Sequence, residues 1–416
     1  MILGPRLSAL GIACRVGLLI SLIGTISSTV YLAMVTVAVR RYRRQAREQQ
    51  RAAQTMRDSD LPAVTVLKPV HGLEPELAQN LASFFDQDYP NFEVVIGARD
   101  EANAALKIAR EVCAKYPHVP SRIVLSGPPA VPNAKVFSLE KMIEGSTNPI
   151  FVISDSDILV SREFLRDIVP PLLKKHNGLV TCIYEGIPAG DLASLLEALG
   201  MSVELPSGVL VANMMEGMRF ALGAVMAVRR DALEAIGGIR TTADYYSDDF
   251  VLGNRVWAAG YKVVLSHYKP GHVLMPRTWS QSFGDQLRWM KSTRYSRPTG
   301  HVGSGLTYAV PFGVLGLCSV MAAGYPGLGW GLLAVSWANR IAQSIIVGWG
   351  VIRDRRALKF CWVYPLRDLL GFFTWLGSFS SPSFQWRGEA YSFGEEGRIT
   401  PRLRPAADSA AEPPAV

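Results

Sequence analysis

The longest apolar stretch of the chain lies near its N-terminus. Residues 16–39 form 24 consecutive positions without a charged side chain. As a helix, this stretch is long enough to cross a hydrocarbon core of about 30 Å. The pattern therefore predicts a transmembrane helix over residues 16–39, preceded by a short N-terminal segment, residues 1–15.

A block of arginines follows this span directly. Seven basic residues lie between Arg40 and Arg57, in a predicted juxtamembrane segment over residues 40–61. A secretory signal peptide would instead have a shorter apolar region followed by a cleavage site of small residues. Because basic flanks stay on the cytoplasmic side, we expect the N-terminus outside and the chain after Arg40 in the cytoplasm.

The net charge of +8 is explained largely by the same arginines. A basic segment beside a membrane span is attracted to anionic lipid headgroups. No basic stripe interleaved with aromatic residues occurs elsewhere in the chain, so we expect a membrane surface and no nucleic acid as partner.

Short apolar runs alternate with helical patterns in the region that follows. Because nearly continuous apolar strands separated by crossover helices are typical of parallel sheets, residues 62–300 are predicted to form a cytoplasmic α/β domain with a mostly parallel sheet. The runs predicted as strands are residues 63–67, 92–98, 122–125, 150–154 and 178–183, and the helical patterns lie at 76–86, 102–116, 135–144 and 162–176.

Apolar segments return after residue 305. Two of them, 306–322 and 330–351, are predicted to form a transmembrane hairpin over 306–351, and basic residues follow on its cytoplasmic side. A further apolar segment, 360–380, has Arg367 and Asp368 at its middle. Charges there would be costly against lipid, so a re-entrant helix is favoured over a transmembrane one. Residues 381–416 are predicted to hold a C-terminal motif, WRGEAY, and a disordered tail rich in Ala and Pro.

Carboxylates follow two of the predicted strands. Asp155 and Asp157 come directly after the apolar run 149–153, and Asp100 follows the run 92–99. Ligands of parallel sheets bind beyond the carboxyl ends of the strands, so we expect Asp100 and Asp155 to face one crevice. Carboxylate oxygens are preferred ligands of Mg²⁺ or Mn²⁺, although an Asp-x-Asp pair on a loop is also compatible with a simple turn.

Five separated motifs carry a resemblance to a known family. The stretch VLKPVHGLEPELAQNLASFFDQDYPNFEVVIGARDEAN is followed in order by SDSDI, YYSDDF, DQLRW and WRGEAY. Together they resemble the ceramide glucosyltransferases and their bacterial relatives, including the hopanoid biosynthesis-associated glycosyltransferases. The resemblance spans about residues 62–391 and implies a GT-A-type nucleotide-diphospho-sugar domain that works on the cytoplasmic face, with transmembrane helices at both ends.

The resemblance also assigns the donor site. It implies that Asp100 binds the uridine base or ribose, and that Asp155 and Asp157 bind a divalent cation carrying the diphosphate. Some relatives have Gly at the position of Asp157. Lys68 and Lys135 lie on candidate nucleotide-facing loops, where they could meet phosphate or simply be solvated.

The family's third aspartate corresponds to Asp249. Inverting transfer of a sugar to an alcohol needs one base that takes the hydroxyl proton, and a single carboxylate serves. Its neighbour Asp248 would raise the proton affinity if both were buried together. Acidic residues here also fit the N-terminus of a helix, and the two interpretations are compatible.

Arg288 and Trp289 complete the last motif. A guanidinium beside an indole can bind a diphosphate and pack against a sugar or acceptor. Relatives commonly carry Gln or Arg where this chain has Asp285, and in polysaccharide synthases that Gln helps to hold the acceptor sugar. Its absence disfavours a polysaccharide acceptor. A basic amphipathic helix on the membrane is the alternative interpretation of the segment.

The sequence hypothesis is a membrane-bound inverting glycosyltransferase that moves a hexose, glucose in the first instance, from a UDP-sugar to the hydroxyl of a lipid such as ceramide. A hopanoid-lipid N-acetylglucosaminyltransferase and a processive polysaccharide synthase are the alternatives. A non-catalytic nucleotide-binding membrane protein would be favoured by loss of an acidic motif position, and none is lost. The apolar region 192–218 fits an interfacial surface where the lipid enters, or ordinary helix packing.

Overall fold

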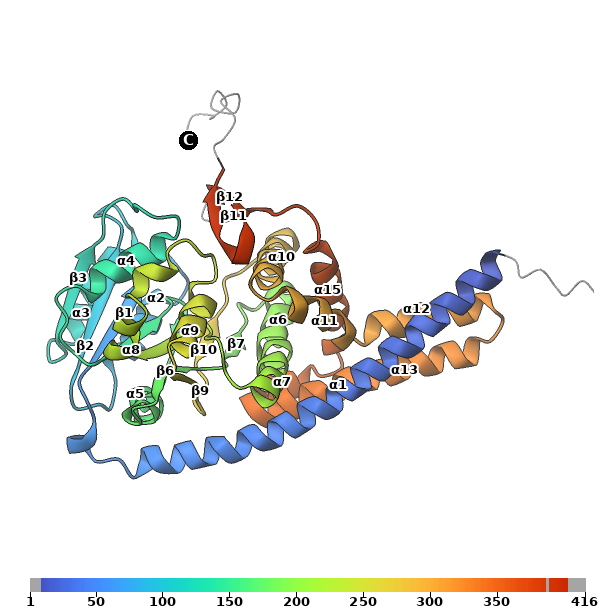
Figure 1. The fold of residues 1–416 in the computed structure, drawn as a ribbon, viewed down its shortest axis with the longest axis horizontal. Helices are drawn as coiled ribbons and strands as arrows, with labels where there is room; N and C mark the ends of the chain where they lie inside the picture. Colours follow the sequence, from blue (N-terminus) through green and yellow to red (C-terminus); the bar gives the residue numbers. More distant parts are fainter. Residues whose placement is uncertain (1–8, 387–388, 403–416) are drawn as a thin grey trace, which may run out of the picture.

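The computed structural model describes residues 9–386 and 389–402 (Figure 1). Its longest element is the helix α1, Ala9–Gln54. This helix contains the predicted span and continues through most of the basic segment. Hydrogen bonds from Tyr42 to the carbonyl of Ser266 (2.9 Å) and from Gln49 to the carbonyl of Leu265 (3.0 Å) tie the basic half of α1 to the α/β domain.

The central sheet of the described chain has seven strands in the order β3-β2-β1-β4-β8-β6-β9. All neighbours pair in parallel except for β8, which runs antiparallel to both β4 and β6. The predicted α/β fold with a mostly parallel sheet is therefore confirmed. In chain order the strands are β1 (Val64–Pro69), β2 (Phe92–Ala98), β3 (Ser121–Leu125), β4 (Ile150–Ser154), β6 (Asn177–Thr181), β8 (Val225–Arg229) and β9 (Lys262–Leu265).

Helices cover both faces of this sheet. One predicted helix, 162–176, is wrong in its extent: it stops at Ile168 and gives way to a 3₁₀ turn at Pro170–Leu173, since proline cannot continue the hydrogen-bond ladder. The helices of the α/β domain are α2 (Leu77–Phe85), α3 (Ala105–Lys115), α4 (Ala134–Ile143), α5 (Phe164–Ile168), α8 (Arg230–Ala235) and α9 (Asp248–Ala258).

Two small sheets lie beside the main one. The strands β5 (Ile158–Leu159), β7 (Glu185–Ile187) and β10 (Gly271–Val273) form the first, with β10 in the middle. The second sheet contains β11 (Ser383–Trp386), β12 (Glu389–Phe393) and β13 (Ile399–Pro401). Of the predicted motif WRGEAY, Arg387 and Gly388 lie outside the described residues, as do residues 403–416 of the tail.

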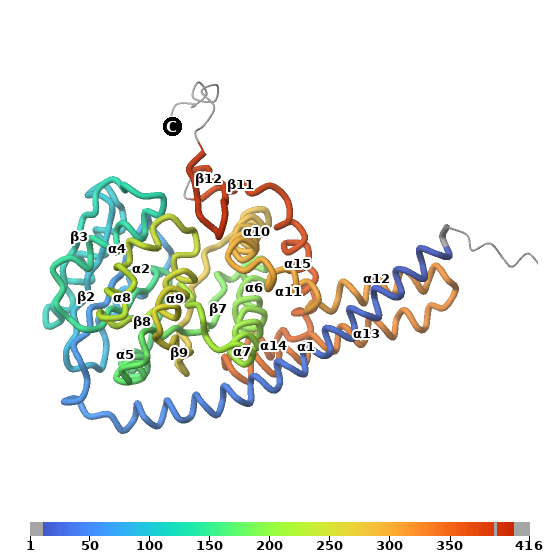
Figure 2. The backbone as a smooth tube through the Cα atoms, viewed as in Figure 1, coloured from blue at the N-terminus to red at the C-terminus, as the bar shows by residue number. Residues whose placement is uncertain are grey.

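The remaining helices lie beside the α/β domain, and α12 and α13 extend along the N-terminal half of α1 (Figure 2). α12 and α13 pack against each other and against α1, which makes a hairpin at the position predicted. The helices are α6 (Leu192–Leu199), the π-helical turn η3 (Gly200–Glu204), α7 (Leu205–Glu216), α10 (Trp279–Ser296), α11 (Pro298–Ser304), the turn η5 (Gly305–Thr307), α12 (Val310–Ala322), α13 (Pro326–Gln343), the π-helical segment η6 (Ser344–Ile352), α14 (Arg355–Lys359) and α15 (Tyr364–Gly377).

Two described helices are long and apolar enough to cross a membrane, residues 11–54 and 192–216. A third candidate arises if Pro298–Thr307 and Val310–Ala322, which meet at 52°, are one bent span. α13 is not in this set. α15, with 14 residues, is not in it either, and the re-entrant placement of residues 360–380 stays a prediction.

Candidate active site

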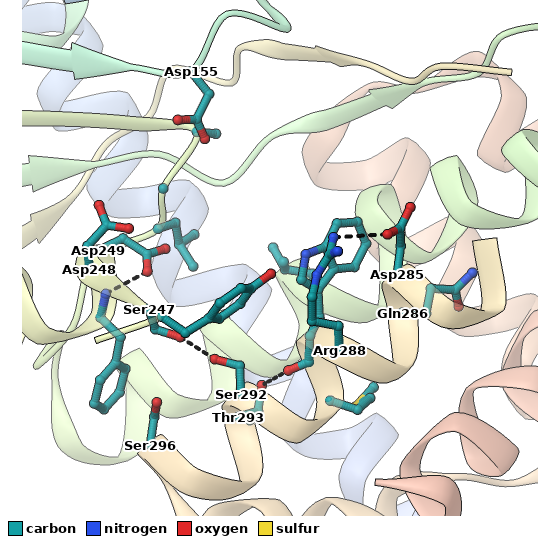
Figure 3. Close-up of a pocket in the computed structure, with 18 of the residues that line it drawn as sticks. Asp155, Ser247, Asp248, Asp249, Asp285, Gln286, Arg288, Ser292, Thr293 and Ser296 are labelled. Carbon is teal, nitrogen blue, oxygen red and sulfur yellow. Dashed lines mark hydrogen bonds and ion pairs between the residues drawn. The ribbon is translucent and has the colours of Figure 1, made fainter. Parts of the chain in front are cut away.

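A cavity of about 2070 Å³ lies where the strand ends meet the helical layer. The end of β1 and the loop 126–132 after β3 contribute to its wall. Seven predicted site residues line it: Lys135, Asp155, Asp157, Asp248, Asp249, Arg288 and Trp289. Figure 3 shows Asp155 above the Asp248–Asp249 pair and Arg288 on the opposite side of the cavity.

Lys135 joins Asp155 to Asp248, the neighbour of the third motif aspartate. It lies in the first turn of α4, whose N-cap Asn133 accepts hydrogen bonds from the amides of Lys135 and Val136. Its Nζ is 2.6 Å from Asp155 Oδ1 and 3.7 Å from Asp248 Oδ2. Burial opposes the charged form, but these carboxylates outweigh it and raise the pKa of Lys135. The ammonium therefore stays charged and holds two motifs together.

Asp249 has the properties expected of a base. α9 begins at Asp248, so both aspartates lie in its first turn, as the helix-terminus interpretation predicts. Burial, and then the charge of Asp248, raise the pKa of Asp249 to about 7. A Cβ on Gly223 would lie 3.0 Å from Asp249 Oδ2 and 3.7 Å from Asp155 Oδ2. The glycine thus leaves room between the carboxylates.

Lys68 lies behind the loop that carries Asp155. It was expected on a nucleotide-facing loop, but it is the fifth residue of β1 and is fully buried. Its Nζ donates to the Asp155 carbonyl, approaches Ser154 Oγ at 3.4 Å and lies 3.8 Å from the centroid of the Phe84 ring. Burial lowers the pKa of Lys68 to about 7. Its role here is to position the loop.

Asp157 is paired with His272, which sequence reasoning missed. His272 Nε2 lies 3.2 Å from Asp157 Oδ2. Burial favours neutral forms of both groups, but their mutual attraction lowers the pKa of Asp157 and raises that of His272 to about 9. His272 stands in a strand of three residues, β10, which has no periodicity by which a sequence could reveal it.

The loop that carries Asp155 and Asp157 has features of a cation site with few protein ligands. Asp157 Oδ1 is buried without a hydrogen-bond partner among the described residues, and the Asp155 side chain is 34% exposed. The described residues contain no cluster of three or more His, Cys, Asp or Glu side chains suited to a metal. Mg²⁺ commonly uses one or two carboxylates, waters and substrate phosphates, so Asp155 and Asp157 fit a cation of that kind.

Asp100 lies apart from the other aspartates. It follows β2 and is exposed, and its Oδ1 accepts a hydrogen bond of 3.0 Å from the amide of Ala102. Within the described chain it does not line the cavity, whereas the preceding residue, Arg99, does. The structure therefore places Asp100 in a strand-end turn and does not bring it together with Asp155.

Arg288 and Trp289 come from α10 on the far wall. Asp285 lies one helical turn before Arg288, and their side chains are 2.9 Å apart. Asp285 also lies 3.4 Å from Arg277, so it pairs with two cations. The Arg288 guanidinium is 6.0 Å from the centroid of the Tyr246 ring. Trp386 and Tyr391, from the C-terminal motif, line the same cavity.

The cavity continues from the carboxylates to the apolar helices α1 and α7. Ser27, Val30, Tyr31 and Met34 of α1 line it, and so do several residues of α7. A single continuous space therefore joins polar groups at the strand ends to the apolar middle of α1.

Comparison with known proteins finds ceramide glucosyltransferases among the sequence relatives of this chain. Ceramide glucosyltransferase 1 of Caenorhabditis elegans is 23% identical over 350 residues, which cover 82% of this chain and 74% of the relative. The ceramide glucosyltransferase of Komagataella phaffii is 33% identical over 147 residues, 34% of this chain and 29% of the relative.

Solved structures are more distant. The mannosyltransferase PcManGT of Pyrobaculum calidifontis, in complex with GDP-Man and Mn²⁺, has a TM-score of 0.47 and 16% identity, and covers 87% of this chain and 100% of its own. TarS 1–349 of S. aureus, in complex with UDP-GlcNAc, has a TM-score of 0.39 and 12% identity, with 81% and 98% covered. At this distance neither structure supports a conclusion about ligands.

The family profile "Glycosyl transferase family 21" matches residues 20–399. This range takes in α1 from residue 20 onward, the whole α/β domain and the C-terminal sheet up to Ile399, and it agrees with the resemblance carried by the sequence motifs. The chain therefore belongs to glycosyl transferase family 21 and is a glycosyltransferase.

Proposed function

We propose that this protein transfers glucose, with inversion, from UDP-glucose to the primary hydroxyl of ceramide at the cytoplasmic face of a membrane. The observation that carries the proposal is the cavity itself. It is lined at one end by Asp155 and Asp249 and at the other by Val30 and Met34 of α1. A water-soluble donor and a lipid acceptor can therefore reach the same space from opposite sides.

Asp249 is the base in this proposal. A pKa of about 7 leaves a large deprotonated fraction at neutral pH together with a substantial affinity for a proton. The carboxylate takes the proton of the lipid hydroxyl as its oxygen attacks the anomeric carbon from the face opposite the leaving diphosphate. Lys135 and Asp248 fix the start of α9 and so the direction from which Asp249 acts.

The donor diphosphate is placed between the Asp155 loop and α10. Asp155 and Asp157 would hold a divalent cation, Mg²⁺ or Mn²⁺, which when bound offsets charge on the leaving UDP. Arg288 supplies a guanidinium from the opposite wall, oriented by Asp285. Trp289, which is 39% exposed, offers an indole face to the sugar or the acceptor.

The proposed membrane arrangement is multi-pass. α1 and the α12–α13 hairpin enter the bilayer, the N-terminus lies outside, and the arginines after residue 40 keep the α/β domain in the cytoplasm. Tyr325, 69% exposed in the turn between α12 and α13, would then face outward. In intact cells an impermeant thiol reagent should label Tyr325→Cys but not Pro120→Cys. The reverse result would place the α/β domain outside the cell, away from the cytoplasmic UDP-sugars, and would contradict the proposal.

Product analysis tests the proposed reaction. Purified protein in nanodiscs is incubated with Mn²⁺ or Mg²⁺ and each of UDP-glucose, UDP-galactose and UDP-N-acetylglucosamine, against ceramide, a hopanoid polyol and diacylglycerol. Mass spectrometry should detect glucosylceramide, with Asp249→Asn as the inactive control. N-acetylglucosaminyl hopanoid as the main product would replace ceramide by the alternative acceptor, and a polymer without lipid would support the synthase hypothesis.

A further inference from the structure

Two acidic residues interrupt the apolar helical segment that runs from α6 through η3 to α7. Glu197 lies in α6, and Glu204 lies seven residues later at the end of the π-helical turn η3. Both line the cavity. Charged side chains in a segment apolar enough to cross a membrane are unfavourable unless they are paired, and they commonly mark functional positions. Glu204 also ends a π-helical turn, a feature frequent at functional sites.

Each carboxylate has polar partners from other segments, and those of Glu204 include the hydroxyl of Tyr308. Glu197 Oε2 accepts a hydrogen bond of 2.6 Å from Ser282 Oγ of α10. Glu204 Oε2 lies 3.0 Å from Arg367 Nη2 of α15. The Glu204 side chain remains 25% exposed. Its Oε2 has no hydrogen bond among the described residues, so the carboxylate keeps capacity to accept one.

Arg367 is buried, although two of its guanidinium nitrogens have no hydrogen-bond partner among the described residues. Its exposed fraction is 6%, it lines the cavity, and its Nε and Nη1 have no hydrogen-bond partner among the described residues. A Cβ on Gly200 would lie 2.4 Å from Arg367 Nε, so the glycine is what allows the helix to pass over the guanidinium. Leaving buried donors unpaired is unfavourable, and a ligand carbonyl would satisfy one of them.

This polar group is electrostatically connected to the reaction centre. The charge of Glu197 acts on Arg367 on one side and on His272 on the other, and His272 is the partner of Asp157. Glu197, Arg367 and Glu204 thus continue the line of charged groups from the catalytic loop toward α1. They are suited to bind the polar region of a lipid whose hydroxyl lies at Asp249.

We infer that Glu204, held in place by Arg367, determines acceptor specificity by accepting a hydrogen bond from the amide N–H or the second hydroxyl of the acceptor lipid, while Arg367 donates to its carbonyl. The inference rests on the proposed function. It gives the site a chemical preference for lipids that carry hydrogen-bond donors beside the reacting hydroxyl. Diacylglycerol has a free primary hydroxyl but no such donor.

The decisive measurement changes the acceptor, which does not affect protein folding. The kcat/KM of the full-length protein is measured in nanodiscs with ceramide, N-methyl ceramide, 3-deoxyceramide and diacylglycerol, all with the primary hydroxyl free. Loss of a hydrogen bond to a carboxylate should lower kcat/KM about tenfold or more for one ceramide analogue and for diacylglycerol. The N-methyl and 3-deoxy compounds show which donor is bound.

Variants then assign the effect to Glu204. Glu204→Leu removes the acceptor oxygens, so its kcat/KM for ceramide should fall to within about threefold of that for the sensitive analogue, and Glu204→Gln should be intermediate. Asp368→Asn is the matched control, because that carboxylate belongs to a buried ion pair of α15 that does not line the cavity; its discrimination should equal that of the parent.

Two results would overturn the inference. One is a parent enzyme that uses all four acceptors equally well, and the other is a Glu204→Leu or Glu204→Gln variant that discriminates as the parent does. If the parent transfers glucose to none of the acceptors, the proposed function is wrong and the inference falls with it.

Discussion

Two buried ion pairs in this protein have similar chemistry and different surroundings. Arg340 and Asp368, between α13 and α15, are 3.2 Å apart and each side chain is 3% exposed. The second oxygen of Asp368 accepts hydrogen bonds from the amides of Ala309 and Val310, where α12 begins. Both carboxylate oxygens are therefore occupied by the protein.

The Lys135 cluster is less complete. Its ammonium contacts Asp155 at 2.6 Å, but that side chain is 34% exposed to the cavity. Asp248 Oδ2 has no hydrogen-bond partner among the described residues. The comparison indicates that burial of charge alone does not mark a functional site. The Lys135 cluster differs in that its charged groups line the cavity, whereas Arg340 and Asp368 do not.

Asp368→Asn should have the largest effect, and it should be on stability. Removing one charge of a buried pair leaves Arg340 uncompensated, which costs about 3–5 kcal/mol. Thermal unfolding in detergent should shift to lower temperature, while turnover per folded molecule stays near that of the parent. If a normally stable variant lost activity, the distinction between the structural pair and the catalytic cluster would fail.

Asp249→Asn should have the largest effect on chemistry. The amide keeps the shape but cannot take a proton, so turnover should fall by roughly 10²-fold or more. UDP affinity, measured by calorimetry, should stay nearly unchanged. Asp248→Asn is the control and should lower turnover less, because Asp248 acts through Lys135 and Asn133 rather than on substrate. An inactive Asp248 variant beside a normal Asp249 variant would reverse the assignment.

Asp155→Asn should act on donor binding. We expect UDP affinity in the presence of Mn²⁺ or Mg²⁺ to fall roughly tenfold or more, the scale of a lost charged interaction. Without metal, variant and parent should bind UDP alike. Equal affinities in the presence of metal would remove Asp155 from the cation site.

Local patterns predicted the sheet better than the site. Apolar runs such as 92–98 and 150–154 coincide with β2 and β4, since a buried parallel strand needs a continuous apolar sequence. Asp155 and Asp249 could be singled out because they belong to motifs. Strands and motif residues could therefore be predicted where one short segment of sequence determines them.

The contacts between segments could not be read in this way. The pairing of Asp157 with His272 joins the turn before β5 to the short strand β10, and the burial of Lys68 in β1 involves Phe84 from α2. The different roles of neighbours Arg367 and Asp368 follow from which helix each faces. Sequence predicted only that this pair would avoid lipid.

The pH dependence of turnover gives the smallest and most specific test of the catalytic cluster. Burial and the charge of Asp248 raise the pKa of Asp249 to about 7. A base works in its deprotonated form, so kcat should rise as pH increases through about 7 and then level off. In Asp248→Asn the like charge is gone, the pKa of Asp249 falls, and the inflection should move to lower pH by roughly one pH unit.

Arg340 and Asp368 lie outside this cluster, so Asp368→Asn should leave the pH profile of the folded enzyme unchanged. An inflection that stays in place in Asp248→Asn would mean that another group is the base, and one that moves in Asp368→Asn would mean that the two ion pairs are coupled.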